Sequence, residues 1–300
     1  EVKEDVEAGA ALNQALRKHP KVFDDLYCNL VASGEQSGSL DTMLRRLADY
    51  QESMLKLRAK VRQAMIYPAA IVSFAIIVAI FMLWKVIPVF GGIYQELGAQ
   101  LPGLTAAVLG LSNFVSRYII IIVVGLIAIV VLYRRWSKTP AGREIVDRTK
   151  LKLPVMGNLM QKISLSRFTR TLSTLIGGGV PMLESLKIAS TTTDNVIIER
   201  QVLNARQMVS EGKSLHDSLK QASQDQFPAM MIQMVNVGES TGTLDEMLGK
   251  LANFFDDEVD NAVSSLLSAL EPLVLIFVGG IVGTLVISMY LPLFNLIQQF

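Results

Sequence analysis

Three long runs of apolar residues interrupt the chain, and each can cross a bilayer as a helix. They read PAAIVSFAIIVAIFMLWKVIPVF, YIIIIVVGLIAIVVLY with a milder apolar lead-in, and LEPLVLIFVGGIVGTLVISMYLPLF. A spanning helix needs about 20 mostly apolar residues, and lipid requires its backbone polar groups to be paired internally. We therefore predict transmembrane helices over 67–90, 114–133 and 268–294.

The more polar segments carry the spacing of helices that bury one face. Apolar residues recur at Leu40, Met43, Leu44, Leu47, Tyr50, Met54 and Leu57, and again at Leu244, Met247, Leu248, Leu251 and Phe254. Strand-like alternation is absent. Three glycines, Gly177, Gly178 and Gly179, should stop one helix, and Pro181 suits the start of the next. The prolines Pro68, Pro88, Pro272 and Pro292 bracket two apolar runs and should kink or end their helices. The fold class is predicted to be all-α.

An internal repeat organises the whole chain. GEQSGSLDTML begins at Gly34 and GESTGTLDEML begins at Gly238, an offset of 204 positions (238 − 34) that continues through the apolar runs. Upstream the offset becomes 203, where DVEAGAALNQAL matches MVSEGKSLHDSL. The repeated unit is a helical domain followed by a spanning helix. Copy two should hold about six helices. Copy one lacks the counterpart of 167–203, so we expect that the chain is a fragment whose natural N-terminus lies earlier.

Charge near the apolar runs predicts their orientation. Basic residues precede the first run and follow the second: Lys56, Arg58, Lys60 and Arg62, then Arg134, Arg135, Lys138 and Arg143. Between these runs, 91–116 carries only Glu96. Because basic residues mark the cytoplasmic side, the chain should start in the cytoplasm and end outside. The predicted organisation begins with part of a first cytoplasmic domain (1–66), a first transmembrane helix (67–90), an outer loop (91–113) and a second transmembrane helix (114–133). A cytoplasmic linker (134–160), a second cytoplasmic domain (161–267), a third transmembrane helix (268–294) and an outer tail (295–300) follow.

The repeated motif has two interpretations. As a helix–turn–helix corner, Gly34 or Gly238 ends one helix in a left-handed conformation and Ser39 or Thr243 caps the next. Thr243 and Glu246 have the spacing of a capping box. Asp41 and Asp245 then lie in a first turn, where the helix dipole favours negative charge. Alternatively, Glu35 with Asp41, and Glu239 with Asp245, form an acidic surface for a hard cation or a basic partner, although two carboxylates are too few to specify a metal.

Residues for catalysis, for a cofactor or for a metal site are not recognisable. Cys28 is the only cysteine, and the chain has two histidines. The fragment EGKS at 211–214 lacks the first glycine of a phosphate-binding loop, because that position is Gln207. A balance of 28 basic against 27 acidic residues gives a net charge of +1 and no reason to expect nucleic-acid binding. We therefore expect no enzyme, no cofactor and no metal.

The apolar runs also lack the mid-membrane ionisable groups of a transporter or channel. Small residues four positions apart occur instead at Ala75 and Ala79 in the first run and at their repeat partners Gly279 and Gly283 in the third. Such residues let helix backbones approach closely. They serve either packing within the chain or a face that receives another membrane helix. A receptor or scaffold that recruits cytoplasmic partners also fits this architecture.

Several segments resemble one family. The segment RFTRTLSTLIGGGVPMLESLKIA, the doubled motif, the helix entries MIYPAAI and ALEPLVL and the ending MYLPLFNL are similar to the inner-membrane platform proteins of type IV pilus and type II secretion systems, with the ending closer to the pilus branch. The resemblance covers essentially the whole chain. The missing first part of copy one departs from the family and leaves the assembly of that domain open.

The resemblance implies two six-helix cytoplasmic domains, three spanning helices in the bacterial inner membrane and no catalysis. It also implies partners: a cytoplasmic hexameric ATPase, pilin or pseudopilin subunits, and other inner-membrane assembly proteins. A platform beneath a helical fibre is expected to be a homo-oligomer. We place the expected ATPase contact near Glu35, Asp41, Glu239 and Asp245. The expected pilin contact, or helix packing, lies at Ala75, Ala79, Gly279 and Gly283.

Overall fold

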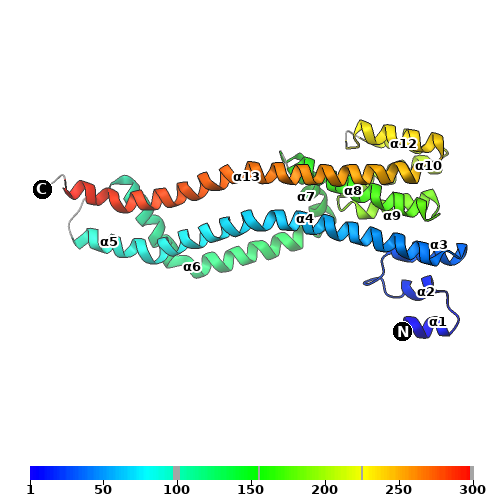
Figure 1. Cartoon of the computed structure of the whole chain (residues 1–300). Helices are drawn as coiled ribbons and strands as arrows, with labels where there is room; N and C mark the ends of the chain where they lie inside the picture. Colours follow the sequence, from blue (N-terminus) through cyan, green and yellow to red (C-terminus); the bar gives the residue numbers. More distant parts are fainter. Residues whose placement is uncertain (97–101, 155, 224–225, 298–300) are drawn as a thin grey trace. The chain divides into compact units, whose positions relative to one another are not determined.

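The structure is a computed structural model that describes residues 1–96, 102–154, 156–223 and 226–297. Every regular element in this part of the chain is helical, which confirms the predicted all-α class (Figure 1). The chain forms two compact units. One contains residues 1–61 and 140–263, and the other contains residues 62–139 and 264–300.

The first unit is built from short helices and from the beginnings of two long ones. Its helices are α1 (Val2–Glu7), α2 (Leu12–Arg17), α3 (Asp25–Ser37), the start of α4 (Leu40–Phe81), α7 (Pro140–Lys152), α8 (Met156–Gly177), α9 (Met182–Thr192), α10 (Val196–Ser210), α11 (Leu215–Ala222), α12 (Ala229–Thr241) and the start of α13 (Leu244–Ile297). The segment expected as a linker over 134–160 is largely helical, because α7 lies within it and α8 begins in it.

The duplication seen in the sequence is also present in the backbone. Helices α1 to α4 correspond to α10 to α13, and α1 and α10 end 203 positions apart (210 − 7). The glycine after each of these two helices has the same left-handed φ, +92° at Gly9 and at Gly212. Helices α7, α8 and α9 have no counterpart in copy one among the described residues.

A large apolar core joins the helices of copy two. Phe168 and Leu172 of α8 pack with Leu186 of α9 and with Leu248 and Phe255 of α13. Polar contacts continue along α8, where Lys162 pairs with Glu258 at 2.6 Å. The ammonium group of Lys162 lowers the pKa of the Glu258 carboxyl below its usual value. The start of α13 is therefore fixed to α8 by both apolar and charged groups.

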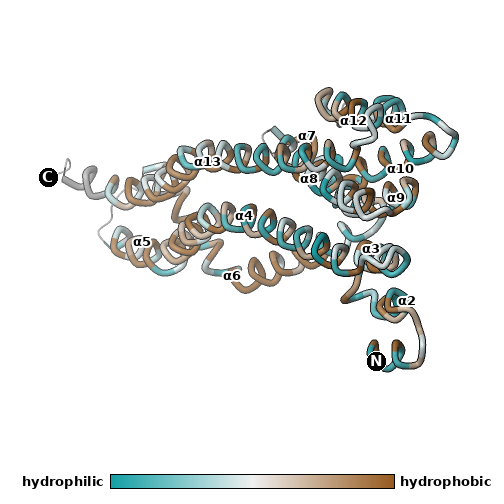
Figure 2. Tube along the Cα trace, turned by 45° about the vertical axis from the view of Figure 1, so that its right-hand side comes forward, coloured by the Kyte–Doolittle hydropathy of each residue, from teal (hydrophilic) through white to brown (hydrophobic). Residues whose placement is uncertain are grey.

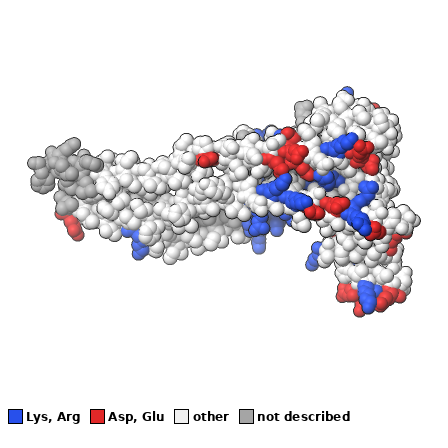
Figure 3. Space-filling model, viewed as in Figure 1, with Lys and Arg blue, Asp and Glu red and all other residues white. Residues whose placement is uncertain are grey.

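The second unit contains the apolar helices. They are the remainder of α4, a π-helical segment η1 (Met82–Val86), α5 (Ile87–Glu96), α6 (Gly103–Trp136) and the remainder of α13. Among the described residues, three helices are long and apolar enough to cross a membrane, as predicted, and Figure 2 shows their hydrophobic stretches. The predicted outer loop over 91–113 is helical up to Glu96 and again from Gly103. Figure 3 shows that charged side chains gather over the helices of the first unit and are sparse on the apolar ones.

Of the two predicted effects of the prolines, kinking or ending their helices, the ending is wrong. Pro68 lies inside α4, and Pro272 and Pro292 lie inside α13. Near Pro88 the helix passes through the π-helical segment, a form of local irregularity often found within α-helices. Ile87 donates its N–H to the carbonyl of Met82, five residues earlier, and Pro88 has no N–H to donate to the carbonyls that follow. Ser112 and Ser116 of α6 donate their hydroxyls to the carbonyls of Leu83 and Trp84 at 2.5 and 3.3 Å, so a neighbouring helix supplies donors here.

Candidate interaction site at the repeated helix corner

The first glycine of the motif lies inside a helix, so the prediction that it ends the helix is wrong. Gly34 belongs to α3 and Gly238 to α12, and both are buried. A Cβ at Gly238 would lie 2.9 Å from the Cα of Leu244, and one at Gly34 would lie 3.0 Å from the Cα of Leu40. These glycines are needed because the backbone of the next helix crosses here without room for a side chain.

The second glycine of the motif ends the helix. Gly38 and Gly242 have φ values of +67° and +72°, a left-handed conformation that glycine adopts at little cost. The next residue in each copy, Ser39 or Thr243, donates its backbone N–H to the carbonyl of Gly34 or Gly238. The capping box predicted for Thr243 and Glu246 is therefore wrong, because the N–H that Glu246 would accept is already bonded. Glu246 pairs with Lys250 at 2.7 Å.

The glutamate of the motif caps another helix of its own repeat. The two carboxylate oxygens of Glu239 accept the backbone N–H groups of Leu215 and His216 at 2.7 and 3.0 Å. Glu35 accepts those of Leu12 and Asn13 at 2.7 and 3.1 Å. Each carboxylate thus accepts hydrogen bonds from N–H groups in the first turn of α11 or α2, which have no partner within the helix. It also lies at the helix end where the dipole favours negative charge. Sequence reasoning missed this role, since cap and helix lie more than 20 residues apart.

The aspartates of the motif have different surroundings in the two copies. Asp41 forms an exposed ion pair with Arg45 at 3.0 Å. Asp245 is partly buried, and its backbone carbonyl accepts the hydroxyl of Ser173 at 2.8 Å. The described residues contain no group of three or more His, Cys, Asp or Glu side chains that could hold a metal ion. The two aspartates are therefore the acids of the motif that do not cap another helix, and Asp41 already pairs with Arg45.

The three glycines after α8 form the contact between the two copies. α8 ends at Gly177, Gly179 has a left-handed φ of +76°, and α9 begins at Met182, directly after Pro181. The carbonyl of Gly178 accepts the hydroxyl of Ser33 from copy one. A Cβ at Gly178 would lie 2.7 Å from the Cδ2 of Leu30. The glycines thus allow helices of copy one to approach this corner closely, in addition to breaking the helix.

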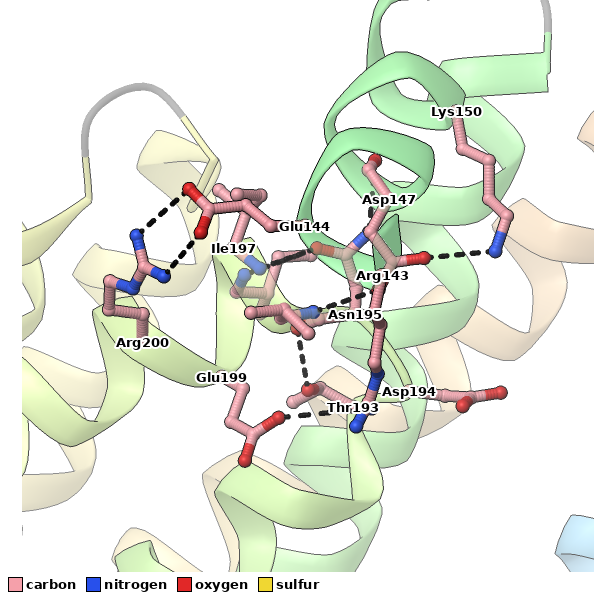
Figure 4. Close-up of polar contacts among 12 residues, drawn as sticks. Arg143, Glu144, Asp147, Lys150, Thr193, Asp194, Asn195, Ile197, Glu199 and Arg200 are labelled. Carbon is pink, nitrogen blue, oxygen red and sulfur yellow. Dashed lines mark hydrogen bonds and ion pairs between the residues drawn. The ribbon is translucent and has the colours of Figure 1, made fainter. Parts of the chain in front are cut away.

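A polar network attaches α7 to the start of α10 (Figure 4). Asp147 is buried, and its carboxylate accepts the backbone N–H of Val196 at 3.2 Å and the ammonium of Lys150 at 2.9 Å. On the surface, Arg200 forms two hydrogen bonds to Glu144, and its guanidinium lowers the pKa of that carboxyl. α7 follows α6 in the chain, so this network fixes the segment after the second apolar helix to copy two.

The small residues of the apolar helices have unequal surroundings. Ala75 is buried, and Ala79 packs against a cluster that includes Ile87, Val108 and Leu285. By contrast, no heavy atom lies within 4 Å of a Cβ placed at Gly279 or Gly283. Within the described residues, the small-residue face is therefore packed in the first apolar helix and open in the third.

The glutamate cap leads to a prediction. Replacing Glu239 by alanine removes both acceptors from the first turn of α11, and we expect the free energy of unfolding to fall by about 1–2 kcal/mol, the usual cost of losing a cap. Glu239→Gln keeps one oxygen acceptor and should lose less. Glu35→Ala in copy one is the matched variant. Thermal unfolding followed by circular dichroism checks this order, and equal stability of Glu239→Ala and the parent chain would contradict it.

Comparison with known proteins gives a consistent result. The chain matches the family of type II secretion system (T2SS) protein F over residues 1–88 and 168–292. It is 42% identical to the type IV pilus assembly protein PilC of Pseudomonas aeruginosa over 99% of this chain and 79% of that protein. It is 44% identical to PilC of Thermus thermophilus, over 99% and 73%. It is 35% identical to the type II secretion system protein F of Vibrio cholerae, over 98% and 72%.

Proposed function

Because the chain belongs to the T2SS protein F family, whose members include pilus assembly proteins, we propose that it is the inner-membrane platform of a type IV pilus or type II secretion machine. The observation that carries this proposal is the 42% identity to a pilus assembly protein over nearly the whole chain. In this role the protein has no catalysis of its own. It couples a cytoplasmic hexameric ATPase to the extraction and assembly of pilin-like subunits.

The architecture supports a coupling role. Helices α4 and α13 are each continuous from a polar helical domain into an apolar stretch. We infer that a movement of the first turns of these helices is passed on along the same helix to its apolar stretch. The α7 network adds a third connection, between copy two and the segment that follows α6. The basic residues around the apolar stretches support the part of the proposal that puts the polar domains in the cytoplasm and the C-terminus in the periplasm.

The candidate contacts follow from the site geometry. For the ATPase we retain the surface of the repeated motif, near Glu35, Asp41, Glu239 and Asp245. Asp41 and Asp245 are the better candidates to meet a basic partner, because neither caps a helix and the pair of Asp41 with Arg45 is exposed. For the pilin-like helix we retain the small-residue positions Ala75, Ala79, Gly279 and Gly283. The open surroundings of Gly279 and Gly283 make α13 the better candidate for close helix approach. Other inner-membrane assembly proteins and further copies of the chain complete the proposed machine.

Binding to an assembly ATPase tests the proposal. The full chain in detergent or nanodiscs should bind a candidate pilus or secretion ATPase, and Asp41→Asn with Asp245→Asn should weaken binding about tenfold, equivalent to about 1.4 kcal/mol. These changes remove charge and leave both glutamate caps in place. The control is Glu4→Gln with Glu7→Gln on α1, which removes two exposed charges elsewhere and should leave binding unchanged.

The outcomes separate the parts of the proposal. Equal binding by the aspartate variant and the parent chain would move the ATPase contact away from the motif. Failure of the parent chain to bind any assembly ATPase would contradict the coupling role. In that case the same architecture would be better interpreted as a membrane-anchored scaffold for other cytoplasmic partners.

A further inference from the structure

A cavity of about 500 Å³ lies between α4 and α13, where both helices enter their apolar stretches. Its wall consists of residues between 63 and 71 of α4 and between 267 and 278 of α13, all within the second compact unit. With the repeat offset of 204, residues 63–71 correspond to 267–275, so equivalent turns of the two copies form the two sides of the cavity. Cavities of this size are typical of binding sites for small ligands.

The wall of the cavity is polar at one end and apolar at the other. Its polar side chains come first along both helices and are Gln63, Tyr67, Ser268 and Glu271. Beyond these residues the wall is entirely apolar and consists of Ile71, Val274, Leu275 and Val278. A helix rises by about 15 Å over the ten residues from 268 to 278, and the hydrocarbon layer of one leaflet is also about 15 Å thick. The cavity therefore matches a lipid molecule in both length and polarity.

Glu271 is the charged residue of this cavity, and its side chain has no partner among the described residues. The second unit contains one other acid, Glu96, which does not line the cavity. Glu271 is exposed, and no hydrogen bond or ion pair joins its carboxylate to another described residue. Its repeat partner Tyr67 lies in the opposite wall and carries no charge. Because an ionisable side chain within a membrane usually pairs with another group, a cationic ligand would stabilise this carboxylate.

We propose that the cavity binds a phospholipid whose headgroup carries a primary ammonium, of the phosphatidylethanolamine class. The ammonium would donate a charge-assisted hydrogen bond to Glu271, and the amide of Gln63 and the hydroxyl of Ser268 can donate to the phosphate. One acyl chain would lie along Ile71 and Leu275 at the apolar end. The proposal goes beyond the platform role, since a lipid site requires a membrane but neither an ATPase nor a pilin.

The lining favours this headgroup over other occupants. No Lys or Arg lies in the described wall, so the negative charge of Glu271 disfavours an anionic lipid. A choline headgroup is cationic but has no N–H to donate to the carboxylate. A helix of a partner protein is too large, because a length of about 10 Å with a diameter of about 10 Å occupies about 800 Å³.

Lipid retention by the full chain tests the proposal. The chain, purified in detergent, is mixed with equal amounts of phosphatidylethanolamine, phosphatidylcholine and phosphatidylglycerol that have the same acyl chains, and bound lipid is identified by native mass spectrometry. We expect phosphatidylethanolamine to be retained about tenfold more than either other lipid, as one added charge-assisted hydrogen bond would give. Equal retention of the three lipids, or preference for phosphatidylglycerol, would overturn the proposal and leave a cationic group of a partner protein as the ligand of Glu271.

Two variants test the two ends of the cavity separately. Glu271→Gln should lower the retention of phosphatidylethanolamine to that of phosphatidylcholine, and Glu96→Gln, which removes the other acid of the unit, should not. Ile71→Trp should lower the retention of all three lipids by filling the apolar end, whereas Ile127→Trp on the exposed face of α6 should have no such effect.

The variants also decide the outcome if one of them fails. An unchanged lipid preference in Glu271→Gln would show that the carboxylate does not hold the ammonium, and full retention in Ile71→Trp would show that the lipid binds elsewhere. Either result contradicts the proposal. Circular dichroism compares the helix content of each variant with that of the parent chain, and Ile71→Trp remains decisive by itself if Glu271→Gln does not fold.

Discussion

Replacing Gly238 by valine is expected to lower the free energy of unfolding by about 3 kcal/mol, at the upper end of the usual cost of overpacking a well-packed site. The physical reason is that a Cβ at this position would lie 2.9 Å from the Cα of Leu244 and 3.1 Å from the Cβ of Met247. Neither atom belongs to a flexible side-chain end. The crossing of α12 and α13 must therefore open, which also exposes part of the core of copy two.

Two variants make this prediction specific. Gly34→Val in copy one meets the Cα of Leu40 at 3.0 Å and should be destabilising in the same way. Asn236→Val on the exposed side of α12 introduces the same side chain at a surface position and should change stability by at most about 0.5 kcal/mol. Thermal unfolding of the full chain measures all three. A Gly238→Val chain as stable as the Asn236→Val chain would show that the helix crossing can relax.

Replacing Gly178 by leucine is expected to separate the two copies of the repeat at a cost of about 3 kcal/mol. A Cβ there would lie 2.7 Å from the Cδ2 of Leu30, 3.1 Å from the carbonyl of Thr174 and 3.2 Å from the sulfur of Met43. The larger side chain would push α3 and α4 away from the corner. The hydrogen bond from Ser33 to the carbonyl of Gly178 would then be lost as well.

Hydrogen exchange distinguishes this effect from general destabilisation. Amides of α3 should lose protection in Gly178→Leu, while those of α10 and α11, in copy two and away from this contact, should keep theirs. Gly125→Leu in α6 is the matched control, because a Cβ at Gly125 meets no heavy atom within 4 Å. Equal loss of protection in α3 and α10 would contradict a local separation of the copies.

The sequence by itself determined the class of the fold, the three apolar helices and the duplication. The class and the apolar helices depend on local pattern, namely the helical spacing of apolar residues and runs of about 20 apolar residues. The duplication is visible because two segments of closely similar sequence stand 204 positions apart, and a comparison of the chain with itself needs no structure. The glycine break between α8 and α9 is also a local pattern and was visible at 177–179, although its contact with copy one was not.

Only the tertiary structure decided what the individual residues of the repeated motif do. The distance between Gly238 and the backbone of Leu244 is not encoded in any local pattern, so sequence alone does not distinguish the glycine that permits close crossing from the one that ends the helix. Glu239 resembles a surface acid in the sequence, because its partners are the N–H groups of α11, which only the folded chain brings near. The contact of Gly178 with Leu30 joins residues of different copies. Local periodicity encodes the helices, but these roles arise from atoms that meet only when distant helices pack.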